Sequence, residues 1–94
     1  MQQIIDRKKY DTETATVLAS DRFWDGSNFE RNGRNTYLYV TKNGNYFAHH
    51  TTQWQGERDT LEALTVEAAK DLYEELPEHD LEYAVAFGEE AEEA

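Results

Sequence analysis

The sequence contains few residue types that could carry out a reaction. Its three histidines are His49, His50 and His79, and the absence of cysteine excludes thiolate nucleophiles and cysteine-based zinc sites. His49 and His50 are neighbours on a predicted strand, so their side chains point to opposite faces and form no joint site. Neither a metal-ligand spacing such as HExxH nor a nucleophile elbow around Ser20 or Ser27 is present. We therefore predict that the protein is not an enzyme and has no catalytic residue, metal site or cofactor.

Carboxylates are the most distinctive groups of the chain, which has a formal net charge of −11. Residues 1–47 have a net charge of +1 and residues 48–94 one of −12, so the acidity is confined to the second half. Uniform acidity would indicate only solubility, whereas segregated acidity predicts a surface of one sign.

A predicted helix after Thr65 places many of these carboxylates on one side. The spacing i, i+4, i+7, i+8 and i+11 gives about one charge per 3.3 Å of helix axis, close to the roughly 3.4 Å between phosphates of one DNA strand. Only Lys70 lies nearby to offset their repulsion. A solvated helix face is the ordinary alternative. The predicted partner-binding carboxylates are Glu67, Asp71, Glu74, Glu75, Glu78, Asp80 and Glu82.

Aromatic residues supply the core and a possible second contact. Two Trp, six Tyr and four Phe can each bury about 150–250 Å², which outweighs a low hydrophobic fraction of 38% and a mean hydropathy of −0.92. Trp54 lies between glutamines in a predicted loop, and Trp24 lies in another. Because tryptophan is enriched at binding hot spots, both are candidates for secondary contact with a partner.

Length and composition predict one domain over residues 1–88, followed by a disordered acidic tail at 89–94. No stretch reaches the roughly 18 apolar residues of a membrane span, and the opening residues lack the pattern of a signal peptide. We therefore expect a cytoplasmic protein. A pI near 4.5 argues against direct binding of nucleic acid, since phosphate contacts need lysine and arginine.

The first half of the chain predicts a strand, a helix and a hairpin. Gln2–Ile5 forms the strand, and a charged turn over residues 6–9 ends it. Asp11 can cap a helix over residues 12–20, although its β-branched threonines weaken this prediction. After a loop over residues 21–35, Asn43-Gly44 indicates a hairpin with a two-residue type I′ turn.

That turn fixes the predicted register of the hairpin. It pairs Val40 with Phe47 and Leu38 with His49, so these four side chains share the face that we expect to form the core. The opposite face carries Tyr37, Tyr39, Tyr46, Ala48 and His50.

The second half predicts one more strand and two helices. Leu61–Leu64 extends the sheet, and a helix over residues 66–76 starts at Thr65 and stops at Pro77. Asp80 can cap a helix over residues 81–87 that ends at Gly88. The expected fold is α+β, in the order β-α-β-β-β-α-α, with helices on one face of a small antiparallel sheet of three or four strands.

Three segments resemble a known family. The opening IIDRKKYDTETA, the central YLYVTKNGNYFAHH and the later LTVEAAKDLYEELPEHDLEYAVAFG together resemble a family of small proteins carried by bacterial phages and mobile elements. Some of its members look like anti-CRISPR proteins, so the resemblance implies inhibition of a host CRISPR effector. The family pattern has glycine where this chain has Arg7, so the first turn departs from it.

Two functional hypotheses follow. In the first, the carboxylates occupy the basic groove of a host nucleic-acid-processing complex in the bacterial cytoplasm, and the protein acts as a monomer or homodimer without binding nucleic acid or a membrane. In the second, it is a protein-interaction or regulatory adapter whose acidity only gives solubility. The adapter surface would then lie in the first half and the loops, at Arg22, Trp24, Arg31, Arg34 and Trp54.

Overall fold

A computed structural model describes residues 1–21, 34–52 and 56–88 of the chain. Trp24, Trp54, most of the predicted central loop and the acidic tail lie outside these described residues. No helix among the described residues is long and apolar enough to cross a membrane. The elements are β1 (Gln2–Ile5), β2 (Lys8–Asp11), β3 (Thr16–Ser20), β4 (Arg34–Val40), β5 (Tyr46–Thr52), β6 (Thr60–Leu64), α1 (Val66–Glu75), β7 (Glu78–His79) and α2 (Tyr83–Phe87).

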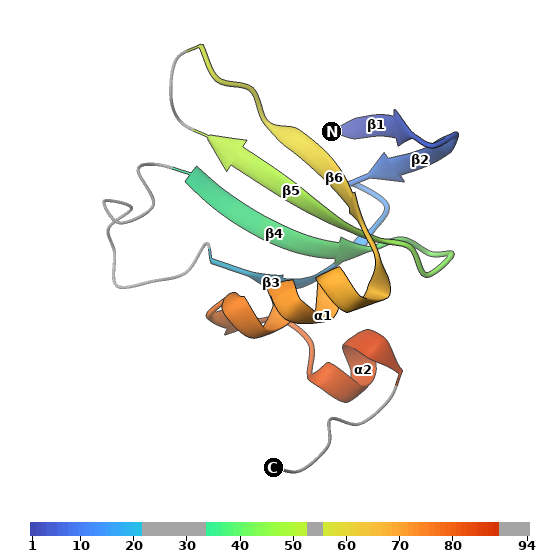
Figure 1. Cartoon of the computed structure of the whole chain (residues 1–94), viewed down its shortest axis with the longest axis vertical. Coiled ribbons are helices and arrows are strands. Elements are labelled where there is room, and N and C mark those ends of the chain that lie inside the picture. Colours follow the sequence, from blue (N-terminus) through green and yellow to red (C-terminus); the bar gives the residue numbers. More distant parts are fainter. Residues whose placement is uncertain (22–33, 53–55, 89–94) are drawn as a thin grey trace.

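The fold is α+β, as predicted, but the sheets differ from the prediction in number and order. An antiparallel sheet has five strands in the order β6-β5-β4-β3-β7, and β1 and β2 form a separate two-stranded sheet (Figure 1). The short strand β7 pairs with β3 directly after Pro77, where no strand was predicted.

The helix predicted over residues 12–20 is wrong, because β3 occupies its second half. The Asp11 carboxylate accepts a hydrogen bond from the Glu13 amide at 3.0 Å, and the Asp11 carbonyl accepts one from the Ala15 amide at 3.1 Å. Asp11 therefore closes a turn instead of capping a helix. The β-branched residues Thr16 and Val17 then favour an extended strand.

The β4–β5 hairpin is confirmed, but its predicted two-residue turn is wrong. The Thr41 amide donates to the Asn45 carbonyl at 2.8 Å and the Gly44 amide to the Thr41 carbonyl at 2.9 Å, so residues 42–44 form a three-residue loop. Only Gly44 has a positive φ, of 82°, as the left-handed position of such a loop requires. The additional loop residue shifts the register by one, so Leu38 pairs with Ala48.

This shift changes which side chains share a face. Leu38 and Ala48 lie with Val40 and Tyr46 on one face, whereas Phe47 and His49 lie with the tyrosines of β4 on the other. The predicted core face of Leu38, Val40, Phe47 and His49 is therefore wrong, because a strand that slips by one residue exchanges its faces.

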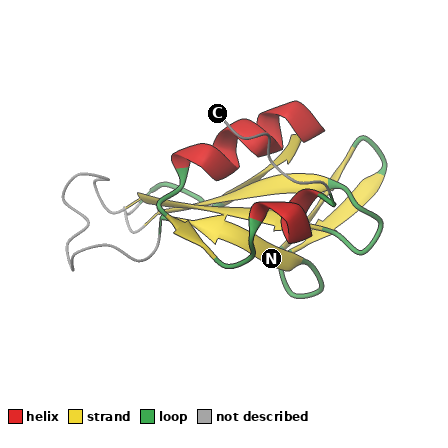
Figure 2. Cartoon of the chain, turned by 90° about the horizontal axis from the view of Figure 1, so that it is seen from below, coloured by secondary structure: helices red, strands yellow, loops and turns green. Residues whose placement is uncertain are grey.

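Both faces of the five-stranded sheet are partly covered. On one face, Leu38 and Leu18 pack with the buried Tyr73 of α1, Ala86 of α2 and Leu76, which directly follows α1. On the other face, Tyr10 of β2 packs edge-on against Phe47, with a ring separation of 5.3 Å. Figure 2 shows α1 lying along the sheet as a separate layer.

The two predicted C-terminal helices are present, but the residue that precedes the second helix differs from the prediction. Thr65 caps α1, and its hydroxyl accepts a hydrogen bond from the Ala68 amide at 3.1 Å. The second helix is shorter than predicted, because Glu82 and not Asp80 precedes it, and no side chain caps it. Gly88 ends α2 in the left-handed conformation, as predicted, with a φ of 72°.

Candidate functional site

One side of α1 is a row of exposed carboxylates. The helix buries Ala69 and Tyr73 against the sheet, which turns the opposite side toward solvent. Leu76 is extended and is followed by Pro77, so the helix ends at Glu75. Glu67, Asp71, Glu74 and Glu75 are all exposed, and we call them the α1 acidic surface.

The α1 acidic surface is compact and has no partner of opposite charge among the described residues. At 100° and about 1.5 Å per residue, its four carboxylates fall within roughly 100° of arc and about 12 Å of axis. None of the six lysine and arginine side chains that the structure describes forms an ion pair with them. Lys70, the only cation on α1, is half-buried, with its ammonium 6.0 Å from the centre of the Phe87 ring. The four carboxylates therefore outnumber the single cation of the helix.

The other predicted carboxylates leave the helical register. Glu78 was predicted to continue the helix face, but it lies in β7, is half-buried, and has one carboxylate oxygen without a hydrogen-bond partner. Asp80 and Glu82 are exposed in the segment between β7 and α2. The predicted spacing of one charge per DNA phosphate therefore holds only over α1.

Tyr73 connects α1 to this segment. Its hydroxyl donates a hydrogen bond to the Leu81 carbonyl at 2.7 Å, and its ring stacks on His79 with 3.9 Å between the ring centres. The Tyr73 carbonyl lies 2.8 Å from His79 Nε2, which is the distance of a further hydrogen bond. Burial raises the pKa of Tyr73, and the negative charge of Glu82 raises it further. These contacts hold the segment that carries Asp80 and Glu82 against α1.

Val85 is an exposed apolar residue that the sequence reading missed. It lies on α2, where 66% of its surface is exposed, and it follows Glu82 by three residues. The helical period of the segment could have indicated the exposure of Val85, because successive residues of a helix point in different directions and the next residue, Ala86, is buried.

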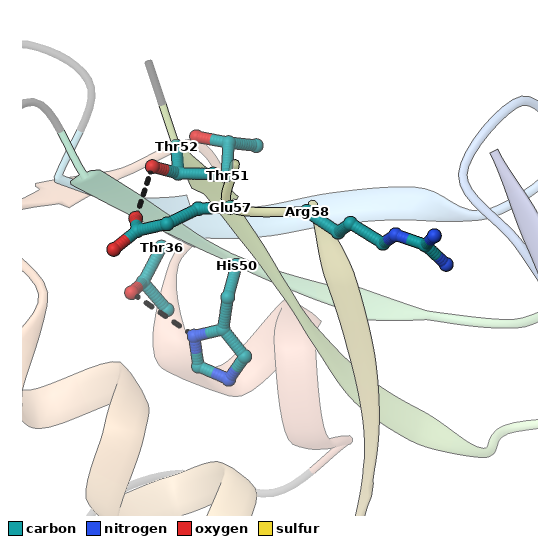
Figure 3. A pocket seen from close by; sticks show the side chains of 6 residues that line it. All are labelled: Thr36, His50, Thr51, Thr52, Glu57 and Arg58. Atoms are coloured by element: carbon teal, nitrogen blue, oxygen red, sulfur yellow. Dashed lines mark hydrogen bonds between the residues drawn. The ribbon is translucent and has the colours of Figure 1, made fainter. Parts of the chain in front are cut away.

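The histidines are separated, as their sequence positions predicted. His49 and His50 occupy opposite faces of β5, and His79 lies in β7 at one edge of the sheet. His50 Nε2 lies 3.0 Å from Glu62 Oε1, and His50 Nδ1 lies 3.4 Å from Thr36 Oγ1. A shallow pocket of about 450 Å³ opens beside His50 (Figure 3). Its lining residues are Thr36, His50, Thr51, Thr52, Glu57 and Arg58.

The polar groups of this pocket are engaged with one another. The Thr52 hydroxyl donates to the Glu57 carboxylate, and the Arg58 side chain points away from His50 (Figure 3). The chain Thr36–His50–Glu62 has the order of a nucleophile, a base and an orienting acid. However, the Thr36 amide donates to the Asp21 carboxylate at 2.8 Å, so it is not available to a developing oxyanion. We derive no reaction from this pocket.

His49 is held differently, on the face that β2 covers. Its Nε2 lies 3.7 Å from Asp59 Oδ2, which in turn belongs to the segment before β6. Burial lowers the pKa of His49 and outweighs the opposing attraction of the Asp59 carboxylate. No group of three or more metal-ligating side chains occurs within the described part of the chain.

Comparison with protein-family models, curated proteins and solved structures finds no match for this chain. The site must therefore be judged by its own geometry. Among the described residues, the α1 acidic surface is a set of four exposed carboxylates without a cationic partner, and Asp80, Glu82 and Val85 lie on the neighbouring segment.

Proposed function

We propose that this protein is a non-catalytic inhibitor of a nucleic-acid-processing protein, of the anti-CRISPR type. The α1 acidic surface enters a basic groove that otherwise holds a nucleic-acid backbone. The observation that supports the proposal is the row of four exposed carboxylates on α1, which have no cationic partner in the described residues. An ordinary solvated helix face mixes charges of both signs, because like charges at i, i+4 are destabilising.

The mechanism is electrostatic and steric. The concentrated negative charge attracts a basic groove over a long range and speeds association. Once α1 is seated, it excludes the nucleic acid from the groove. Val85 of α2 is an exposed apolar side chain that could add a contact with a protein partner.

A DNA-cleavage assay with purified CRISPR effector complexes tests the proposal. The parent protein should inhibit cleavage by a susceptible complex, and the double variant Asp71→Lys/Glu75→Lys should not, because it reverses two of the four charges of the α1 acidic surface. Both substituted positions are exposed, so the circular dichroism spectrum should be unchanged.

Glu13→Lys is the matched control, since Glu13 is exposed in the turn before β3 and far in sequence from α1. It should inhibit as well as the parent. Raising the salt concentration from about 0.05 M to about 0.5 M should slow association of the parent markedly. Equal inhibition by the parent and the double variant, or association that does not respond to salt, would refute the proposal and favour the adapter.

A further inference from the structure

The described cations gather at one end of the molecule. Six lysine and arginine side chains are described, and four of them lie in or beside the β1–β2 and β4–β5 turns. All four are exposed. We call them the hairpin-tip cluster: Arg7, Lys8, Lys9 and Lys42.

A hydrogen bond joins the two turns. The Lys8 ammonium donates to Asn45 Oδ1 at 3.5 Å, and Asn45 closes the turn that carries Lys42. Both turns point to the same end of the molecule (Figure 1). Asp6 is the one carboxylate within the β1–β2 turn itself, so the cluster keeps an excess of positive charge.

The β1–β2 turn is also strained. Ile5 pairs with Lys8, so Asp6 and Arg7 form a two-residue loop, and both have positive φ angles, of 50° and 66°. Type I′ turns need this conformation and strongly prefer asparagine and glycine. An arginine there costs conformational energy, which glycine would avoid. The chain thus keeps a guanidinium at the outermost point of the hairpin despite its cost.

The two charged surfaces belong to opposite sides of the sheet. The β1–β2 hairpin packs through Tyr10 on the face of Phe47, and α1 packs on the face of Leu38. We propose that the hairpin-tip cluster docks on the α1 acidic surface of a second copy of this chain. Arginine can bind a carboxylate through two parallel hydrogen bonds, which suits Arg7 to this contact. Because the two surfaces differ, the association is head-to-tail and adds copies in a row.

The net charge gives this association an unusual dependence on salt. Two copies of net charge −11 repel each other over long distances. At about 0.1 M salt the screening length is roughly 10 Å, which is short against a molecule 40 Å long. Long-range repulsion is then screened, while contacts between the two surfaces persist. Association should therefore be greatest at intermediate salt, and it should be weak, because exposed ion pairs contribute little to affinity.

Sedimentation velocity at about 10 mM, 0.1 M and 1 M salt tests the proposal with the protein alone. The weight-average sedimentation coefficient of the parent should rise with protein concentration, most strongly at the middle salt. Arg7→Gly/Lys42→Gln removes two charges from the cluster and should sediment as a monomer. Arg58→Gln removes an exposed cation elsewhere and should behave like the parent.

Mixing variants identifies the two surfaces. Arg7→Gly/Lys42→Gln weakens the hairpin-tip cluster and keeps the acidic surface intact, and Asp71→Lys/Glu75→Lys weakens the acidic surface and keeps the hairpin-tip cluster intact. Each should be monomeric alone, and their mixture should form a 1:1 dimer that does not grow. A monomeric parent at every salt, an equal loss in Arg58→Gln, or a monomeric mixture would overturn the inference. No outcome of this experiment depends on the partner in the proposed function.

Discussion

The Tyr73 hydroxyl donates a hydrogen bond to the Leu81 carbonyl at 2.7 Å, across the segment that separates α1 from α2. Tyr73 is buried, so this phenol leaves the solvent and needs a partner within the protein. The bond fixes the segment that carries two of the predicted partner-binding carboxylates, Asp80 and Glu82. One buried tyrosine thereby couples the core of the domain to the placement of its acidic groups.

Tyr73→Phe should lower the free energy of unfolding by about 1–2 kcal/mol, because the Leu81 carbonyl loses its donor while the ring packing is kept. For a domain of this size, that corresponds to a fall in Tm of roughly 4–16 °C. Tyr83→Phe is the control, since no hydrogen bond joins the hydroxyl of the half-buried Tyr83 to another described residue. Urea and thermal unfolding measure both variants, and an equal loss in the two would contradict the assigned role of the Tyr73 bond.

Arg7→Gly should stabilise the protein by about 1 kcal/mol, because glycine adopts the positive φ of the β1–β2 turn without strain. Gly44→Ala should do the opposite and destabilise by a similar amount, since Gly44 has a φ of 82° with open space around it. In a urea unfolding experiment, the first substitution removes the free-energy cost of a non-glycine residue at positive φ, and the second introduces it. A stability loss in Arg7→Gly would show that the arginine side chain stabilises the turn by more than its strain.

Structural features that depend on a single residue or on the period of one helix or strand were predicted correctly from the sequence. Thr65 and Gly88 act at the ends of the helices because capping depends on one side chain or one φ angle. The exposed row on α1 follows from the helical period, since its apolar positions lie opposite. The separation of His49 and His50 follows from the alternation of a strand.

Features that depend on competing local and long-range interactions were not predicted. The Asp11 carboxylate could either cap a helix or close a turn. Because β3 pairs with β4 as an extended strand, Asp11 closes a turn. Asn43-Gly44 fits two loop lengths, and the choice moves Phe47 from one face to the other. Glu78 lies outside the helix because Pro77 ends it, and β7 then pairs with β3, which the periodicity of the acidic run does not show.

Thr65→Ala should destabilise the domain by about 1 kcal/mol, because the Ala68 amide loses the acceptor that Thr65 provides at 3.1 Å. Thr65→Ser keeps a hydroxyl at the same position and should retain nearly all of the stability. The loss should appear as a lower urea midpoint with an unchanged slope, since the fold is the same. If serine and alanine were equally destabilising, the methyl group rather than the cap would be responsible.

The stability of the domain should fall as the pH decreases below about 6.5, in part through His49. Burial lowers the pKa of His49 in the folded protein, so the unfolded chain takes up its proton at a higher pH. Protonation therefore favours unfolding, and the contribution of His49 is present above the unfolded pKa and is lost as the pH falls through this range. His49→Gln should flatten this dependence, whereas His50→Gln, which changes the exposed neighbour paired with Glu62, should retain the His49 contribution. Urea unfolding between about pH 8 and pH 5.5 measures the slopes, above the range where most carboxylates titrate. An identical slope in the parent and His49→Gln would show that burial of this ring does not control its protonation.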